Sequence, residues 1–265
     1  YPELEHDLTF LRRRWMQDDL GESYVLVNMA DFELKVVDRH KTIFVDHVVV
    51  GTSYNKTPLF SDRLSYLVFN PAWHIPPSIA RKEMLPKIQK DIGYLAANNI
   101  TVLSNWTSDA TVVDPRTVNW KALSRRNFPY KLRQEHGANN ALGRIKFVFP
   151  NRHNIYLHDT PARALFSRTV RSFSHGCIRI EHPIELAKIL LRNNPEWPPE
   201  AIEEGIGSGT PRIVPLKTKL PIHLVYITAW VNKDGLVNFR DDIYGQDRLL
   251  AAALDKDRRD VKSAR

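Results

Sequence analysis

The chain has 265 residues but only one cysteine, Cys177, which lies in the sequence SHGCIR at residues 174–179. A thiol attacks a carbonyl carbon as the thiolate, so a catalytic cysteine needs a base or a positive field, and main-chain amides directed at the developing oxyanion. Gly176 permits a tight turn on which the amides of His175, Gly176 and Cys177 converge, and Arg179 adds positive charge. These residues predict a nucleophilic thiol.

Two histidines, His175 and His158, are candidates for the base that accepts the thiol proton. His158 ends the predicted strand NIYLH, 19 positions before Cys177, so a loop can return the chain beside it. A histidine two positions away on a tight turn tends to point elsewhere. We therefore favour His158, with its other ring nitrogen held by a neighbouring carbonyl or by Asp159.

Two other interpretations of the cysteine stay open at this point. A lone cysteine is more often a small buried apolar residue than a nucleophile. Zinc binding is the second alternative, because one cysteine and four histidines lie in this part of the chain: His153, His158, His175, Cys177 and His182. Their spacing matches no common zinc pattern, and we expect no metal and no other cofactor.

Composition limits the class of protein. The chain is 43% hydrophobic and carries 38 basic against 30 acidic residues, a net charge of +8, which favours a polyanionic partner, whether nucleic acid, anionic lipid or an anionic cell-wall polymer. The charge is spread out and no nucleic-acid recognition motif is present, so we expect no nucleic-acid binding. No run of residues is apolar enough to span a membrane.

The elements that must position these residues are mostly strands. Residues 24–28, 32–38 and 42–51 are rich in β-branched residues and are separated by short polar turns, which predicts a β-meander, and further strands are predicted at 67–69, 145–149, 154–158 and 221–231. Helices are predicted after Pro183 and after Pro199, so the thiol lies on a turn ahead of a helix. Leu4, Leu8, Leu11 and Trp15 have helical spacing, which predicts an N-terminal helix at residues 1–20.

The sequences YLHDTP (156–161) and SFSHGCIRIEHPIELAKILL (172–191) resemble the signature of the L,D-transpeptidases with a YkuD-type catalytic domain. The resemblance extends over nearly the whole chain and is nearest to the large periplasmic enzymes of the YcbB type. It includes VVVGTSYNKTPLFSD, PAWHIPPSIARKEMLPKI and VYITAW. Asp159 departs from the common pattern, because many members have glycine after the histidine.

The resemblance implies a mainly β fold with helices: a YkuD-type β-sandwich catalytic domain with an inserted α-rich capping subdomain. On this basis we expect the catalytic domain at residues 21–76 and 141–250, the capping subdomain at 77–140 and a C-terminal tail at 251–265. Four residues at the entrance to the insertion could face the cleft: Tyr66, Phe69, Trp73 and His74. A peptidoglycan-binding domain, which such enzymes also carry, is not found in this chain.

The resemblance also implies a reaction. Cys177 would form a thioester with a tetrapeptide stem of peptidoglycan and expel D-alanine, and a second stem would accept the acyl group to give a 3→3 cross-link. His158 would act as base and then acid, and His175, Gly176 and Ser174 would form the oxyanion loop. Tyr156 and Arg179 would contact the substrate, and Asp159 would orient the base.

Expectations about partners and location follow from the same resemblance. The partners would be donor and acceptor stem peptides, with carbapenems as covalent inhibitors, and the chain is expected to be monomeric. Its location would be the Gram-negative periplasm, with no export signal or anchor in this chain. Two alternatives stay open: an L,D-carboxypeptidase or cross-link hydrolase that uses the same cysteine, and a non-catalytic wall-binding module.

Overall fold

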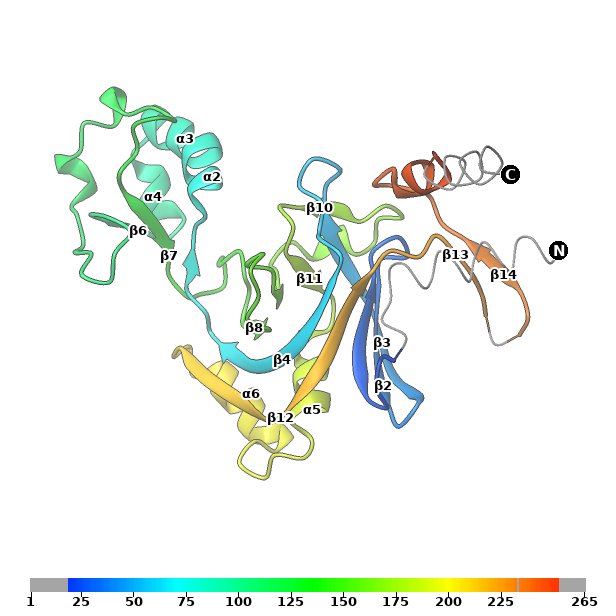
Figure 1. Ribbon diagram of the computed structural model, residues 1–265. Coiled ribbons are helices and arrows are strands. Elements are labelled where there is room, and N and C mark those ends of the chain that lie inside the picture. The colour runs from blue at the N-terminus through cyan, green and yellow to red at the C-terminus, as the bar shows by residue number, and fades with distance from the viewer. Residues whose placement is uncertain (1–18, 233, 253–265) are drawn as a thin grey trace.

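A computed structural model describes residues 19–232 and 234–252 of the chain (Figure 1). The helix predicted at residues 1–20 and the tail predicted at 251–265 lie almost entirely outside these residues. Within the described part, no helix has the length and apolar character needed to cross a membrane.

The main sheet has nine strands, in the order β10-β3-β11-β9-β8-β4-β12-β1-β2. An additional pairing of β2 with β3 closes all of these strands except β10 into a ring of eight. The two layers of the predicted sandwich are therefore joined by hydrogen bonds at their edges. The mainly β fold is thus confirmed. The strand bounds are β1 Tyr24–Asn28, β2 Glu33–Asp38, β3 Lys41–Gly51, β4 Phe60–Phe69, β8 Ile145–Val148, β9 Leu157–His158, β10 Ser172–Ser174, β11 Ile178–Ile180 and β12 Arg212–Val225.

The core of this ring is built by alternate residues of each strand. In β1 the side chains of Val25 and Val27 are fully buried while their neighbours are half-buried, as expected for one face of a strand directed at a core. Phe69 and Phe147 are also fully buried in this core. Phe69 is one of the four residues that could face the cleft, and its full burial rules this out, because alternation in β4 directs it inward.

Two helices cover part of the core. Helix α5 (Pro183–Leu191) and helix α6 (Pro199–Gly207) lie side by side below the sheet in Figure 1, and each begins with proline at its first position. The predicted helices after Pro183 and Pro199 are therefore confirmed. Between them, Trp197 packs edge-on against Phe69, with ring centroids 5.3 Å apart.

The C-terminal end of β3 pairs with the parallel strand β10 on one edge and with the antiparallel strand β11 on the other. The main-chain N–H of Val48 donates to Phe32, and that of Val50 donates to Arg171, so β2 and β10 follow one another along the same edge of β3. Strand β11 pairs with the other edge, where Arg179 lies opposite Val49. The loop 175–177 therefore crosses the end of β3 from one edge to the other.

The segment between β4 and β8 forms a separate body to one side of the main sheet (Figure 1). It has its own cluster of buried residues, which includes Ile75, Leu132 and Trp120, and a three-stranded sheet in the order β5-β7-β6. Its elements are β5 Trp73–His74, α2 Pro77–Ile79, a π-helix η1 Ala80–Met84, α3 Leu85–Lys90, α4 Gly93–Ala97, β6 Ile100–Leu103, the 3-10 helices η2 Pro115–Thr117 and η3 Trp120–Ala122, and β7 Lys131–Gln134.

More residues of this body lie in helices than in strands, as predicted, but its helices are short and it also contains a three-stranded sheet that was not predicted. The strands were missed because each has at most four residues, too few to show alternation. The capping role and the boundaries at 77 and 140 stay predictions.

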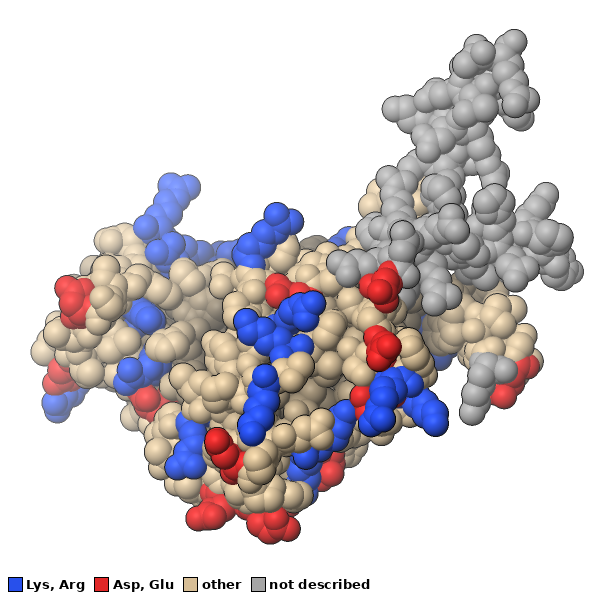
Figure 2. Space-filling model, turned by 60° about the horizontal axis from the view of Figure 1, so that its bottom comes forward, with Lys and Arg blue, Asp and Glu red and all other residues tan. Residues whose placement is uncertain are grey.

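The remaining elements are a 3-10 helix η4 (Arg163–Leu165) and a hairpin of β13 (Ala229–Val231) and β14 (Val237–Phe239). The predicted strand at 221–231 is divided between β12 and β13, and β12 starts at Arg212, nine residues earlier than predicted. Figure 2 shows Lys and Arg spread over the displayed face with Asp and Glu between them, which agrees with the dispersed charge expected from the sequence.

Candidate active site

Three neighbouring strands position the candidate residues. Strand β9 runs parallel to β11, with Leu157 opposite Ile178 and His158 opposite Arg179. The main-chain N–H of Ile178 donates to the carbonyl of Tyr156 at 3.1 Å, which places Cys177 beside Tyr156. Because side chains alternate along a strand, the buried Leu157 and Ile178 define the core face.

The opposite face therefore carries the candidate nucleophile and base together. Cys177 and Arg179 of the β11 segment lie on it with Tyr156 and His158 of the β9 segment. Cys177 and His158 occupy diagonal positions on adjacent strands, a relation that typically separates Cα atoms by about 7–8 Å and lets long side chains meet. The structure thus brings together four of the residues selected from the sequence.

His158 is held in one orientation by the main chain. Its Nδ1–H donates to the carbonyl oxygen of Asp159 at 2.5 Å, which leaves Nε2 as the nitrogen that can accept a proton. Only 5% of the residue is exposed, and burial lowers its pKa to about 3. The charges of Arg179 and Lys146 also lower this pKa, while the Asp159 carbonyl opposes the shift. The imidazole is therefore neutral at ordinary pH.

The Asp159 carboxylate has a different task from the one considered for it. Its Oδ2 accepts the main-chain N–H of Arg144 at 2.9 Å, and its Oδ1 accepts that of Thr160 at 2.7 Å. A Cβ at Gly143 would lie 2.3 Å from Asp159 Oδ2, so only glycine fits beside it. Asp159 therefore orients His158 through its main-chain carbonyl and not through its side-chain carboxylate.

Cys177 is half-buried beside Tyr156. Its S–H donates to the Asn154 carbonyl at 3.8 Å, and no hydrogen bond joins the sulfur to His158 within the part of the chain that the structure describes. Burial raises the pKa of Cys177, whereas hydrogen bonds from the main-chain N–H and hydroxyl of Tyr156 and the charges of Lys146 and Arg179 oppose the increase. The resting site thus holds a neutral thiol and a neutral imidazole.

Tyr156 links the thiol to the segment between β4 and β8. Burial raises the pKa of Tyr156, the Cys177 sulfur adds to this effect, and a hydrogen bond from Trp73 works against it. The Tyr156 ring lies 5.6 Å from that of His158, measured between centroids. Trp73 is one of the four entrance residues that could face the cleft, and its effect on the Tyr156 pKa indicates that it lies near the site.

The loop that carries Cys177 is fixed by Ser174. Ser174 Oγ accepts the main-chain N–H of Gly176 at 3.0 Å and donates to the Cys177 carbonyl at 2.5 Å. Gly176 has φ +115°, a conformation that disfavours other residues. The Gly176 amide is therefore already used, contrary to its expected role in the oxyanion hole. The amides of His175 and Cys177 have no acceptor among the described residues, so two of the three expected donors are free.

The His175 side chain turns away from the nucleophile. Its Nε2 lies 2.6 Å from Glu83 Oε1 in helix η1, and both side chains are 45% exposed. His175 is thus not placed as a base, in agreement with the preference for His158. The contact joins the Cys177 loop to the segment between β4 and β8.

A network that the sequence did not reveal supports the loop from beneath. Thr57 Oγ1 donates to the Gly176 carbonyl at 2.8 Å and accepts the N–H of Gly51 at 2.9 Å. The Tyr244 hydroxyl donates to the Gly51 carbonyl at 2.8 Å, and its ring stacks on Tyr226 at 5.2 Å. No local motif marks Thr57, because its partners are 6 and 119 positions away along the chain.

Lys146 is the second residue that the sequence analysis did not select. It lies on β8 directly opposite His158, and its Nζ is 3.9 Å from the centroid of the Tyr156 ring. Burial lowers the pKa of Lys146, and Cys177 opposes this shift. The available signal was a single lysine in the apolar strand IKFVF, on the face opposite its buried residues.

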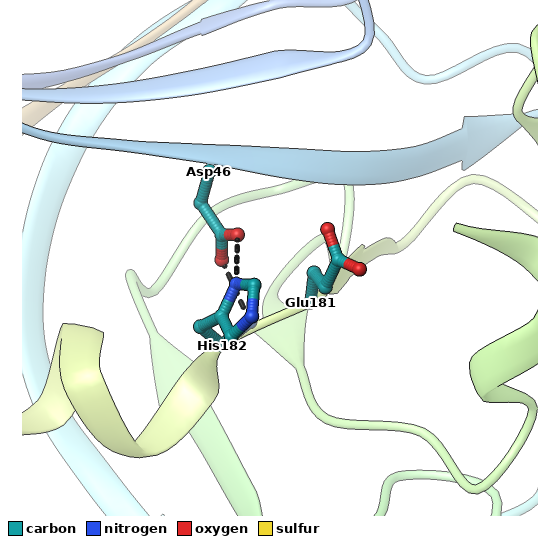
Figure 3. A group of neighbouring side chains, drawn as sticks. All are labelled: Asp46, Glu181 and His182. Carbon is teal, nitrogen blue, oxygen red and sulfur yellow. Dashed lines mark hydrogen bonds and ion pairs between the residues drawn. The ribbon is translucent and has the colours of Figure 1, made fainter. Parts of the chain in front are cut away.

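One cluster outside this site could be considered for a metal ion. Potential ligand atoms of Asp46, Glu181 and His182 lie within 4.8 Å of one another (Figure 3). The buried Asp46 carboxylate, however, already accepts bonds from the N–H of His47 and from both the N–H and Nδ1 of His182. These bonds explain the cluster as a support for the start of α5, and they assign His182 to this role rather than to the Cys177 site.

A thiol on a supported turn, beside an imidazole with one nitrogen held by a main-chain carbonyl, is the arrangement expected of a cysteine-dependent acyl-transfer enzyme. The sequence profile of the YkuD family, the L,D-transpeptidase catalytic domain, matches residues 22–214. The chain therefore belongs to the YkuD family of L,D-transpeptidase catalytic domains.

Relatives agree with this assignment. A Haemophilus influenzae protein provisionally named as an L,D-transpeptidase is 36% identical over 229 residues, which are 86% of this chain and 45% of the relative. The chain thus spans about half the length of this relative. Nearness to the YcbB type stays a prediction.

Among solved structures, the chain is similar to an L,D-transpeptidase from Mycobacterium smegmatis. The two are 12% identical, and the alignment covers 77% of this chain and 58% of that one with a TM-score of 0.34. The catalytic domain of an Enterococcus faecium L,D-transpeptidase, acylated by ertapenem, is 11% identical, with TM-score 0.29 over 78% and 99% of the two chains. The family assignment rests on the profile and the sequence relative.

Proposed function

We propose that this chain is the catalytic part of a peptidoglycan L,D-transpeptidase that forms 3→3 cross-links through a thioester on Cys177. The observation that carries the proposal is the placement of Cys177 and His158 on one face of two paired strands, with His158 Nδ1 held by the Asp159 carbonyl. Family membership supports acyl transfer as the type of reaction.

In the first step, His158 Nε2 removes the thiol proton as the Cys177 sulfur attacks the carbonyl carbon between the third and fourth stem residues. The new S–C bond puts negative charge on the carbonyl oxygen, which the free amides of His175 and Cys177 stabilise. The C–N bond then breaks, and His158 returns its proton to the departing D-alanine nitrogen. Each oxyanion donor is typically worth about 3 kcal/mol.

In the second step, an amine of the acceptor stem attacks the thioester carbon. His158 takes the amine proton as the C–N bond of the cross-link forms and the C–S bond breaks, and the imidazolium then returns that proton to the departing Cys177 sulfur. The neutral imidazole described above is the form that this step requires. With water in place of the amine, the same residues would give a carboxypeptidase.

We further propose that residues 77–140 cap the site and exclude water from the thioester. The contact from Glu83 to His175 supports this role, because it joins residues 77–140 to the loop that carries Cys177. A periplasmic location, with peptidoglycan stems as donor and acceptor, belongs to the same proposal.

The test is incubation with purified disaccharide-tetrapeptide, with the products read by mass spectrometry. Cross-linked dimers and free D-alanine are expected from the wild-type chain, and neither from Cys177→Ala. Tripeptide monomer alone would assign the chain as a hydrolase. Turnover by the Cys177→Ala variant would reject a cysteine mechanism, and full biological function of that variant would favour a non-catalytic binding module.

A further inference from the structure

Two half-buried cations flank the candidate base, His158, without a carboxylate partner. Lys146 and Arg179 are the cross-strand neighbours of His158, one on β8 and the other on β11. Neither forms an ion pair with any residue that the structure describes, although ion pairs are common elsewhere on the chain. Charges that are largely withdrawn from water are normally paired, so two half-buried cations without a partner are unusual.

The surroundings of each cation leave it able to accept an anion. The Lys146 ammonium lies 3.9 Å from the centre of the Tyr156 ring, a contact that offers no hydrogen-bond acceptor to its N–H groups. Arg179 Nε is buried and has no hydrogen-bond partner. An unsatisfied donor of this kind is costly unless a ligand pairs with it.

The position of the cations identifies the ligand by its chemistry. Lys146 and Arg179 lie on either side of His158, and both charges act on the Cys177 thiol, so an anion held between them would lie near the reacting groups. In a stem that ends one residue beyond the scissile bond, the terminal carboxylate is separated from the attacked carbon only by the nitrogen and the α-carbon. One further residue would move the carboxylate away from both cations.

We propose that Lys146 and Arg179 form a subsite for the carboxylate of the residue that is expelled when Cys177 is acylated. The subsite rests on the proposed function and assigns to two named residues the recognition of the terminal carboxylate of the tetrapeptide donor. The carboxylate stays ionised throughout, and the leaving nitrogen receives its proton from His158.

Alkylation of Cys177 tests the subsite without any stem peptide. The ratio of the rate constants for iodoacetate and iodoacetamide measures the preference for a carboxylate, and the thiolate fraction cancels because both reagents attack the same sulfur. The ratio for the wild-type chain, normalised to that of the urea-unfolded chain, is expected to be about three- to tenfold above one. Lys146→Met should lower it about threefold or more, and Lys146→Arg should retain it.

Lys217→Met is the matched control, because it removes one exposed positive charge from β12, outside the three strands that carry the site. Its ratio should equal that of the wild type. A wild-type ratio equal to that of the unfolded chain, or an equal fall in Lys146→Met and Lys217→Met, would overturn the subsite.

Stem peptides then identify which carboxylate is bound. Blocking the terminal carboxylate as D-alaninamide should raise KM for the wild type about tenfold and leave Lys146→Met much less affected. Amidation of the diaminopimelate side-chain carboxylate should not distinguish the two proteins, and the reverse pattern would reject the expelled residue as the ligand. If the wild type consumes no stem peptide at all, the proposed function fails, whereas the alkylation ratio still judges the subsite.

Discussion

Protonation of His158 should control much of the stability of the fold in acid. Burial lowers the pKa of this imidazole from 6.5 to about 3 in the folded chain, whereas the unfolded chain binds the proton near 6.5. Below pH 6.5 His158 is therefore protonated in the unfolded state but not in the folded state, so the free energy of unfolding falls as the pH decreases. The full shift corresponds to about 5 kcal/mol, of which about 3 kcal/mol is lost between about pH 8 and pH 4.5.

The measurement compares the wild-type chain with His158→Asn, whose amide N–H can replace the bond to the Asp159 carbonyl. Urea unfolding followed by tryptophan fluorescence gives the free energy of unfolding of both proteins at about pH 8 and pH 4.5. The wild type should lose about 3 kcal/mol more than the variant over this range. Other titrating groups are common to the two proteins and cancel in the comparison.

A difference below about 1 kcal/mol would refute the reasoning, because it would mean that His158 titrates near its ordinary pKa in the folded chain. The imidazole would then be protonated in mild acid and could not act as the neutral base described above. A lower stability of the variant at pH 8 alone would not affect the test, because only the change with pH enters it.

Three further predictions concern the loop and its thiol. Thr57→Val should lower the free energy of unfolding by about 2–4 kcal/mol in urea titrations, because the buried Gly51 N–H and Gly176 carbonyl lose their partner, while Thr57→Ser should stay close to the wild type. The rate of alkylation of Cys177 by iodoacetamide should rise about tenfold per pH unit between about pH 6 and pH 8, because burial raises the pKa of the thiol. No inflection is expected near pH 6.5, because His158 stays neutral over this range. A plateau in the rate below about pH 8 would contradict this prediction. Carbapenems should acylate Cys177, because they present a strained carbonyl to it, and an unchanged intact mass after prolonged exposure would contradict the assignment.

The sequence was sufficient for the residues whose roles follow from local chemistry. The Gly176 turn, the alternating strands and the prolines that begin α5 and α6 are local signals, and all appear in the structure. The choice of His158 over His175 also agrees with the structure, since His175 contacts Glu83.

Roles that depend on distant partners were not accessible from the sequence. Lys146 looks like an ordinary lysine in a strand until β8 is aligned with β9, and Thr57 gains its role only through Gly176. The predicted strand at 154–158 was too long: Asn154 has φ +54°, which breaks the extended conformation, and β9 contains only Leu157 and His158.

The crossing of loop 175–177 over the end of β3 has a mechanical consequence. Because β10 and β11 grip opposite edges of one strand, a displacement of β3 carries both ends of the loop with it, and β9 follows through its ladder with β11. The sulfur and the imidazole are thus attached to one hydrogen-bonded scaffold, which ties their relative position to the pairing of β9, β11 and β3.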